Sequence, residues 1–325
     1  MWETALAFAI WGGYGSVLTA AHIDPSLTAI ARSAILGILL TTASVVIGRV
    51  RRSAKASAVA KAMADRRSRG GGRSAERPPD ITAPIPWRSG VLWISGAVML
   101  VDEVLYSVSA VSGPVAIIGL AYGCVPLLTP LLSRLSGTDT AHAMRARHWM
   151  CLVVAFIGNA MVFSVLQAAQ IHFTMAAVFA FLAGLLFTVM PVFSAKLQQR
   201  GLGTMAVLKS QSAVGAILSV PLLALLVAIG AIALGGPGHA DLVTRSIEMG
   251  AFNSIAFTLT PFYFWYRGVA RCGVSRTSIC AFAEPLVATL FSLFVLKDAP
   301  ATPMLLAGAG LVLAAIAVSA RSGGE

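Results

Sequence analysis

The chain has 325 residues, of which 57% are hydrophobic and only 11% are charged, and its mean hydropathy is +0.82. A soluble globular protein usually carries about 25% charged residues, so the composition excludes an ordinary soluble enzyme and indicates a membrane protein. The formal net charge is +11. Basic cytosolic loops account for this charge, and we expect no nucleic-acid partner.

Ten apolar stretches, each about long enough to cross a bilayer, follow one another along the chain. Because the hydrocarbon holds no water to pair with backbone groups, such stretches form helices, and a barrel would need alternating strands of about ten residues. The predicted spans are residues 4–20, 26–48, 90–111, 114–133, 147–166, 173–194, 206–234, 247–266, 277–296 and 302–320. The sequence therefore predicts an all-α polytopic membrane protein with ten transmembrane helices.

Positive charge falls on one side of these spans. With a cytosolic N-terminus, all but three of the 24 Lys and Arg residues lie in cytosolic connections or at the C-terminus, and the exceptions are Arg32, Arg245 and Lys297. The positive-inside rule predicts that both termini are cytosolic, in a bacterial-type inner (plasma) membrane. The lipid bilayer is thus an expected partner, and the oligomeric state, monomer or dimer, stays open.

Residues 49–89 form the one long polar segment between spans. They are rich in Arg, Ala, Ser, Gly and Pro, and such a segment cannot bury a core of its own. Residues 53–67 contain good helix formers, so we expect the second helix to continue a few turns into the cytosol. We interpret the segment as a basic cytosolic topology anchor, and a regulatory or lipid-binding role is the alternative.

The two halves of the chain resemble each other. A single shift along the sequence brings Pro126 onto Pro285 and Asp139 onto Asp298. Because each half contains five predicted spans, an odd number, the second half must enter the membrane upside down relative to the first. We predict two inverted five-helix repeats, residues 1–166 (with the basic loop 49–89) and 167–325, with a binding site between them.

Three short motifs point to a family. They are "WGG" at residues 11–13, "DPSLTAIARS" at the start of the second span and "AEPLVATLFSLFVLKDAP" at 283–300. With these motifs the chain resembles the EamA-type ten-helix transporters of the drug/metabolite transporter superfamily. The resemblance implies a secondary transporter of small molecules. Asp139 and Asp298 stand where relatives often have Glu, and the loop at 49–89 is longer than usual, so a substrate does not follow by analogy.

Four ionisable residues lie inside predicted spans, namely Arg32, Asp102, Glu103 and Glu284. A charge at the bilayer centre costs about 2.5–3.5 kcal/mol on insertion scales, so such residues usually face a partner or a wet cavity. At 1.5 Å per residue, Arg32 and Asp102 lie at similar depths, roughly 9–12 Å from the outer boundary. We therefore predict that Arg32 is the structural charge partner of Asp102 or Glu103.

Asp102 and Glu103 are adjacent and point about 100° apart on a helix, so one can pair while the other faces the cavity. The cavity-facing acid would suit proton exchange against substrate, and a structural role for both acids is the alternative. Glu284 precedes Pro285, which frees a backbone carbonyl, so it can serve either the helix or the substrate.

Four deep aromatic residues are further candidates for substrate binding. Trp11 and Tyr14 share one face of the first helix, Tyr122 is similarly deep in the fourth, and Tyr263 is the one residue of an aromatic run in the eighth that is deep enough to be a cavity candidate. Together with a carboxylate, they could form an aromatic cage around a cationic group. Core packing is the alternative for each of them.

We predict a secondary active transporter that exports small organic metabolites, such as amino acids, amines or cationic drugs, by proton-coupled antiport or exchange with alternating access. A membrane-embedded enzyme and a channel are the alternatives. The sequence has no HExxH, GxSxG or paired-His pattern and no nucleotide-binding loop, so we predict no catalytic residue, metal or cofactor. It also has no filter-like loop or ring of like charges.

Overall fold

The structure is a computed structural model, and all regular elements of its described part are helical, without a strand. This confirms the prediction of an all-α fold. The described residues are 1–12, 14, 23–65, 80–112, 125–138, 146–166, 175–232, 239–291, 293–294 and 302–321. Tyr122, Asp139 and Asp298 lie outside these ranges, as do residues 66–79 of the long loop.

Five helices of the described part are long and apolar enough to cross a membrane, judged by length and composition. Their apolar stretches are Pro25–Arg51, Gly90–Ser112, Met175–Gln199, Thr204–Ala228 and Pro303–Arg321. Val125–Leu135 and Ala146–Val162 are shorter apolar helices. Several long apolar helices in one chain indicate a multi-pass membrane protein.

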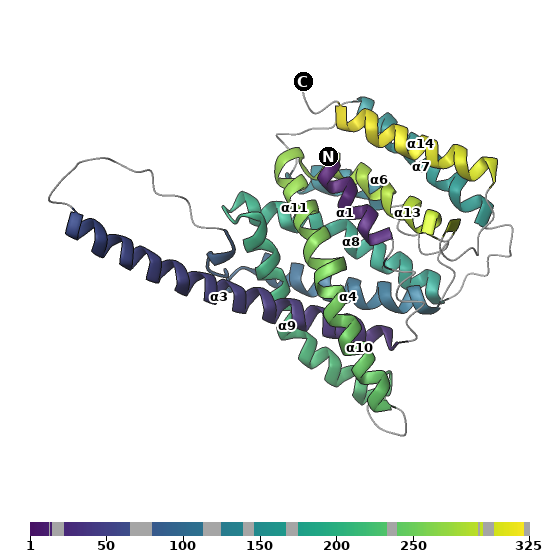
Figure 1. Ribbon diagram of the computed structural model, residues 1–325. Helices are drawn as coiled ribbons and strands as arrows, with labels where there is room; N and C mark the ends of the chain where they lie inside the picture. The colour runs from purple at the N-terminus through teal and green to yellow at the C-terminus, as the bar shows by residue number, and fades with distance from the viewer. Residues whose placement is uncertain are drawn as a thin grey trace.

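The helices of the first half follow the order of the predicted spans. They are α1 (Trp2–Gly12), α3 (Pro25–Asp65), α4 (Gly90–Ser112), α6 (Val125–Leu135) and α7 (Ala146–Leu166), with a short 3-10 helix η1 (Asp80–Thr82) before α4. α3 has 41 residues and projects well beyond the other helices (Figure 1). Its predicted continuation into the polar segment is confirmed as far as Asp65, because Ala, Lys and Arg favour a helix.

The second half contains two interrupted helices. Its elements are α8 (Met175–Gln199), α9 (Thr204–Ala228), α10 (His239–Asn253), the π-helix η3 (Ser254–Leu259), α11 (Thr260–Cys272), α12 (Val274–Ser278), the 3-10 helix η4 (Ile279–Phe282), α13 (Ala283–Phe291) and α14 (Pro303–Arg321). The span predicted at 247–266 is longer than expected, since α10, η3 and α11 form one helical rod with polar ends. The span predicted at 277–296 is broken at η4, because Pro285 lacks an N–H and opposes the carbonyl of Ala281.

The packing brings helices from the two halves together. α3 packs against α9 and α10, and α4 packs against α8 and α9. α1 contacts α11 and α13, and α6 contacts α8 and α12. α7 and α14 lie side by side at one edge of the bundle (Figure 1).

The bundle buries several ionisable side chains in a largely apolar core and exposes large apolar side chains on its surface. The buried side chains include the ionisable residues Arg32, Asp102, Glu103, Lys209 and Glu284. The exposed side chains include the large apolar residues Ile38, Met150, Val220, Leu306 and Leu313. An apolar surface around buried ionisable groups suits a lipid environment.

Lys209 ties the long loop to the bundle. It lies in α9, is buried, and its ammonium donates hydrogen bonds to the carbonyls of Ile81 and Ala83 and to the hydroxyl of Ser44 at 3.2 Å. The sequence places Lys209 among the basic residues of a cytosolic connection. In the structure its long side chain instead fixes the end of the loop, near η1, against α9 and α3.

Two glycines allow the close approach of α7 and α14. A Cβ atom at Gly158 would meet the carbonyl oxygen of Gly308, and a Cβ atom at Gly308 would meet the carbonyl oxygen of Gly158. Small residues at a helix crossing permit backbone contact inside a membrane, where the hydrophobic effect does not drive helices together. The crossing of α7 and α14 therefore depends on both glycines.

We expect Gly308→Leu to lower the melting temperature of the detergent-solubilised protein, because overpacking at this crossing costs about 1–3 kcal/mol. Gly310→Leu is the matched control, since Gly310 lies on the same helix and faces open space. Thermal unfolding followed by size-exclusion chromatography measures both. Equal melting temperatures for the two variants would contradict the proposed crossing.

Candidate functional site

A buried ion pair joins α3 to α4. The Nη2 atom of Arg32 donates to Oε1 of Glu103 at 2.8 Å, and the two side chains are only 4% and 2% exposed. The hydroxyl of Ser33 donates to the other carboxylate oxygen of Glu103 at 2.7 Å. Of the two acids that the sequence offers to Arg32, the ion pair thus forms with Glu103.

Arg32 also contacts the aromatic residues of the site. Its guanidinium carbon lies 4.7 Å from the centroid of the Tyr14 ring, which is a cation–π geometry. Tyr14 stacks on Tyr106 with ring centroids 5.6 Å apart, and its hydroxyl lies 3.3 Å from that of Ser107. The backbone carbonyl of Arg32 accepts a hydrogen bond from Ser254 at 2.8 Å. Arg32 therefore links α3 to α4, to the first span and to the π-helix η3.

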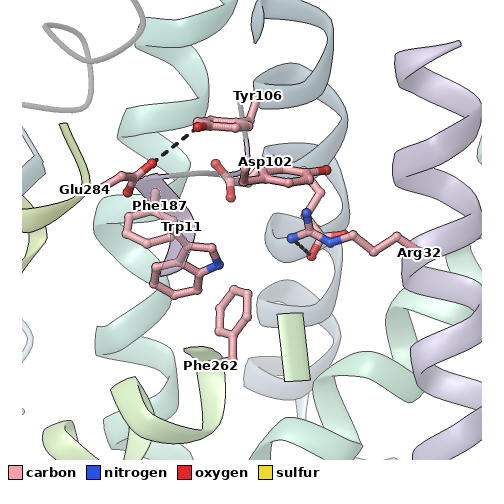
Figure 2. Close-up of a pocket in the computed structure, with 9 residues that line it drawn as sticks. Trp11, Arg32, Asp102, Tyr106, Phe187, Phe262 and Glu284 are labelled. Carbon is pink, nitrogen blue, oxygen red and sulfur yellow. Dashed lines mark hydrogen bonds and ion pairs between the residues drawn. The ribbon is translucent and has the colours of Figure 1, made fainter. Parts of the chain in front are cut away.

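Asp102 and Glu284 place two further carboxylates around the same cavity. The Asp102 carboxylate points from α4 toward the side on which Trp11 and Glu284 lie (Figure 2). Glu284 comes from α13, at the opposite wall, and accepts a hydrogen bond from the Tyr106 hydroxyl at 3.4 Å. Both acids are buried. One acid therefore comes from each half of the chain.

Aromatic side chains close the remaining wall of the cavity. Trp11 packs edge-on against Phe187 and Phe262, with ring centroids 5.6 and 4.9 Å apart. The indole N–H of Trp11 donates to the carbonyl of Phe257 at 2.6 Å, within η3. π-helical segments frequently occur at functional sites. This wall offers an apolar surface directly beside the charged groups.

The cavity is small in this conformation. Its volume is about 30 Å³, which is room for about one or two water molecules. Its lining consists of Trp11, Tyr14, Arg32, Asp102, Glu103, Tyr106, Phe187, Phe262 and Glu284. An organic molecule would need the surrounding helices to move apart.

Six of the residues singled out from the sequence meet in this cavity, namely Trp11, Tyr14, Arg32, Asp102, Glu103 and Glu284. Tyr263 does not line it, and its ring instead lies 5.7 Å from that of Phe264. Its neighbour Phe262 takes the cavity position, because adjacent residues point about 100° apart on a helix. Tyr122 lies outside the described residues.

The sequence does not single out three of the residues that line the cavity, namely Tyr106, Phe187 and Phe262. Tyr106 follows Asp102 by one helical turn, so the two share a face of α4, and this spacing could have identified it. Phe187 lies in an apolar helix without a distinguishing neighbour. Only the packing of α8 against α4 and the first span brings it to the site.

The described residues hold no group of three or more His, Cys, Asp or Glu side chains that could bind a metal ion. Cys151, Cys272 and Cys280 are free thiols. The chemistry of the cavity within this part of the chain is therefore that of carboxylates, a guanidinium and aromatic rings.

The fold and the cavity can be compared with known proteins. Residues 174–321, somewhat less than half of the chain, match the sequence model of a family described as "EamA-like transporter family". A solved structure described as "Crystal structure of protein" is similar with a TM-score of 0.64 at 18% identity, covering 99% of this chain and 96% of that chain. At this identity the likeness shows the fold alone. No curated protein matches the chain.

An apolar helical bundle around a polar cavity defines the general class, a multi-pass helical membrane protein. Residues 174–321 are thus similar to a family of membrane transporters, and this match supports the resemblance to the EamA-type branch of the drug/metabolite transporter superfamily.

We expect Arg32→Ala to destabilise the folded protein by about 3–5 kcal/mol, because it leaves the buried Glu103 carboxylate without its ion-pair partner. Arg245→Ala is the control, since Arg245 and Asp241 form an exposed pair at 3.7 Å, and such pairs contribute little. Chemical unfolding in detergent measures both. A double change of Arg32 and Glu103 to leucine should recover part of the loss, and equal stability of the two single variants would contradict the role of the buried pair.

Proposed function

We propose that this protein is a secondary active transporter that exports small organic metabolites carrying a positive group, such as amino acids, amines or cationic drugs. The observation that carries the proposal is the meeting of Asp102 and Glu284 with aromatic rings in one buried cavity. Carboxylates attract a cationic group, and aromatic faces bind it by cation–π contact. Family membership supports the transporter class.

The three acids of the cavity divide into two roles. Glu103 is held by Arg32 and Ser33, and we assign it to the structure. Asp102 and Glu284 flank the space itself (Figure 2). A cavity-facing carboxylate can bind either a proton or an ammonium group, but not both at once. This competition is the simplest basis for proton-coupled antiport or for exchange.

We infer further that residues 1–166 and 167–325 are inverted repeats. In this arrangement α1 corresponds to α8, α3 to α9, α4 to α10 and α11, α6 to α12 and α13, and α7 to α14. The observed packing has the matching symmetry, since the contact of α4 with α8 is repeated by that of α1 with α11, and the contact of α6 with α8 by that of α1 with α13. α3 packs on α9 and α7 on α14, so these helices each meet their own counterpart. This pattern supports a two-fold relation.

Alternating access follows from such a relation. The cavity has room for about one or two water molecules, so substrate entry needs one group of helices to rock against the other. The π-helix η3 and the break at η4 lie in two spans that border the cavity. Both interruptions are suitable places for a helix to bend.

We expect Asp102→Asn to leave folded yield unchanged and to lower transport driven by a pH gradient by about 100-fold or more, because a positioned proton-transfer group typically contributes at least that much. Purified protein in proteoliposomes, tested with labelled amino acids and amines under an imposed pH gradient, provides the measurement. Asp241→Asn is the control, since Asp241 is an exposed acid in the first turn of α10.

Three results would contradict the proposed function. One is wild-type pH dependence in the Asp102→Asn variant together with loss of it in Glu103→Gln. Another is conversion of the labelled compound into a product, which would favour a membrane-embedded enzyme. The third is non-saturable flux, which would favour a channel. Saturable accumulation of the intact compound is the expected result.

The proposed orientation places both termini and residues 49–89 in the cytosol. We expect an impermeant thiol reagent added to intact cells to label a His239→Cys variant and to spare a Gly70→Cys variant, each in a background without the four native cysteines. Labelling after membrane permeabilisation controls for reactivity of both sites. Labelling of the Gly70→Cys variant from outside would reverse the orientation.

A further inference from the structure

Arg32 has more hydrogen-bond donors than its ion pair uses. Its Nη2 atom donates to Glu103, but its Nε and Nη1 atoms are buried and have no hydrogen-bond partner within the described part of the chain. The residue as a whole is only 3% exposed. Leaving a buried donor of a charged group without an acceptor is costly. These two atoms therefore need an acceptor from outside the protein.

The groups around the guanidinium do not supply enough acceptors. Both carboxylate oxygens of Glu103 are engaged, one by Arg32 and the other by the Ser33 hydroxyl. The Tyr14 ring lies against the guanidinium, with its centroid 4.7 Å from Cζ, and the Tyr14 hydroxyl is also close to it. This hydroxyl already bonds to that of Ser107. A single hydroxyl satisfies only part of a guanidinium, which carries a fork of N–H donors and no acceptor.

The guanidinium borders the space in which the proposed substrate binds. Arg32 lines the central cavity together with Asp102 and Glu284. Figure 2 shows the guanidinium, the Asp102 carboxylate and the Glu284 carboxylate in this order across the cavity. The volume of about 30 Å³ has room for about one or two water molecules, which can satisfy the donors when no substrate is bound. A substrate that displaces this water must bring an acceptor of its own.

A carboxylate is the acceptor that suits a guanidinium best. Hydrogen bonds between the two are charge-assisted, short and often bidentate, because the planar fork of N–H groups matches the carboxylate in shape. Asp102 adjoins Glu103 on α4, so its Cα lies about 3.8 Å from that of the residue that holds Arg32. The cavity therefore places a positive and a negative group close together. An α-amino acid carries the complementary pair, since its carboxylate and its ammonium are attached to the same carbon.

A simple amine is the competing occupant. The lining of the cavity contains three acids and one base, so its overall charge attracts a cation. An amine, however, offers no acceptor to the Nε and Nη1 atoms of Arg32 once the water has left. A site with polar groups that are built to bind a partner rejects analogues without that partner, because the polar groups are then left unpaired.

We propose that the Nε and Nη1 atoms of Arg32 form a carboxylate subsite, so that the cavity accepts zwitterionic compounds, α-amino acids above all, in preference to simple amines and cationic drugs. Arg32 then holds Glu103 through one nitrogen and the substrate carboxylate through the others, while Asp102 and Glu284 face the substrate ammonium. This assignment, which rests on the proposed transport function, narrows its substrate class.

The first test uses the wild-type protein. The melting temperature of the purified protein is measured with each common α-amino acid, with the amine that lacks its carboxylate and with its methyl ester, which lacks the negative charge. We expect at least one amino acid to stabilise the protein. Its amine and its ester should need about tenfold higher concentrations or more for the same effect, because the charge-assisted hydrogen bonds to Arg32 are lost.

Each other outcome of this test contradicts one specific claim. An amine or ester that stabilises the protein as well as its parent amino acid would overturn the carboxylate subsite and leave the export of cations standing. The absence of any stabilising amino acid would overturn the subsite as well. Stabilisation by an amino acid that is not transported in proteoliposomes would instead refute the proposed function and leave the binding site standing.

The second test measures the same preference in Arg32→Lys, which keeps a positive charge opposite Glu103 but replaces the planar fork with an ammonium. We expect the preference for the amino acid over its amine to fall by about tenfold or more. Purely structural damage would weaken the binding of both compounds alike. Arg245→Lys, at an exposed position, is the control. An unchanged preference in Arg32→Lys would overturn the proposal, and the comparison on the wild-type protein does not depend on the folding of this variant.

Discussion

The ion pair between Arg32 and Glu103 fixes α3 against α4, and the other contacts of the cavity build on that position. Arg32 holds the Tyr14 ring over its guanidinium, and its backbone carbonyl binds Ser254 at the start of η3. A buried pair of this kind is weak evidence for stability, because desolvation offsets most of the attraction. The role of this pair is to position the helices. It holds a carboxylate and a guanidinium inside an apolar bundle, and Asp102 and Glu284 line the same cavity beside them.

The cavity combines features that suit a moving cation. Acids from both halves of the chain lie on opposite walls, and edge-on aromatic rings fill the space between them. The cavity's volume of about 30 Å³ leaves little room for water, and a low local dielectric strengthens each electrostatic contact. In the proposed function, binding and opening are coupled, since a substrate must separate helices that pack together when it is absent. Interrupted helices at η3 and η4 provide places where that movement can occur without breaking the long spans.

The sequence predicts the all-α fold and singles out four charged residues that line the candidate cavity, Arg32, Asp102, Glu103 and Glu284, because burying a charge in lipid is costly. Helix geometry also predicts that the side chains of Asp102 and Glu103 point in different directions. Only the structure shows that Glu103 is the acid that pairs with Arg32. In an apolar chain, an aromatic residue indicates a functional site less clearly than a charged residue does. The position expected for Tyr263 belongs to Phe262, because adjacent residues point about 100° apart on a helix and depth alone does not show which of the two faces the cavity.

In the proposed function, substrate binds in the cavity between the two halves of the chain. The most direct measurement is the rate at which a small methanethiosulfonate reagent modifies a Phe187→Cys variant, in a background without native cysteines, as a transported compound is added. The account predicts that the compound slows modification in a saturable way, at concentrations that also saturate transport, and does not protect a Tyr263→Cys variant, which lies outside the cavity lining. Protection at Tyr263 without protection at Phe187 would contradict it.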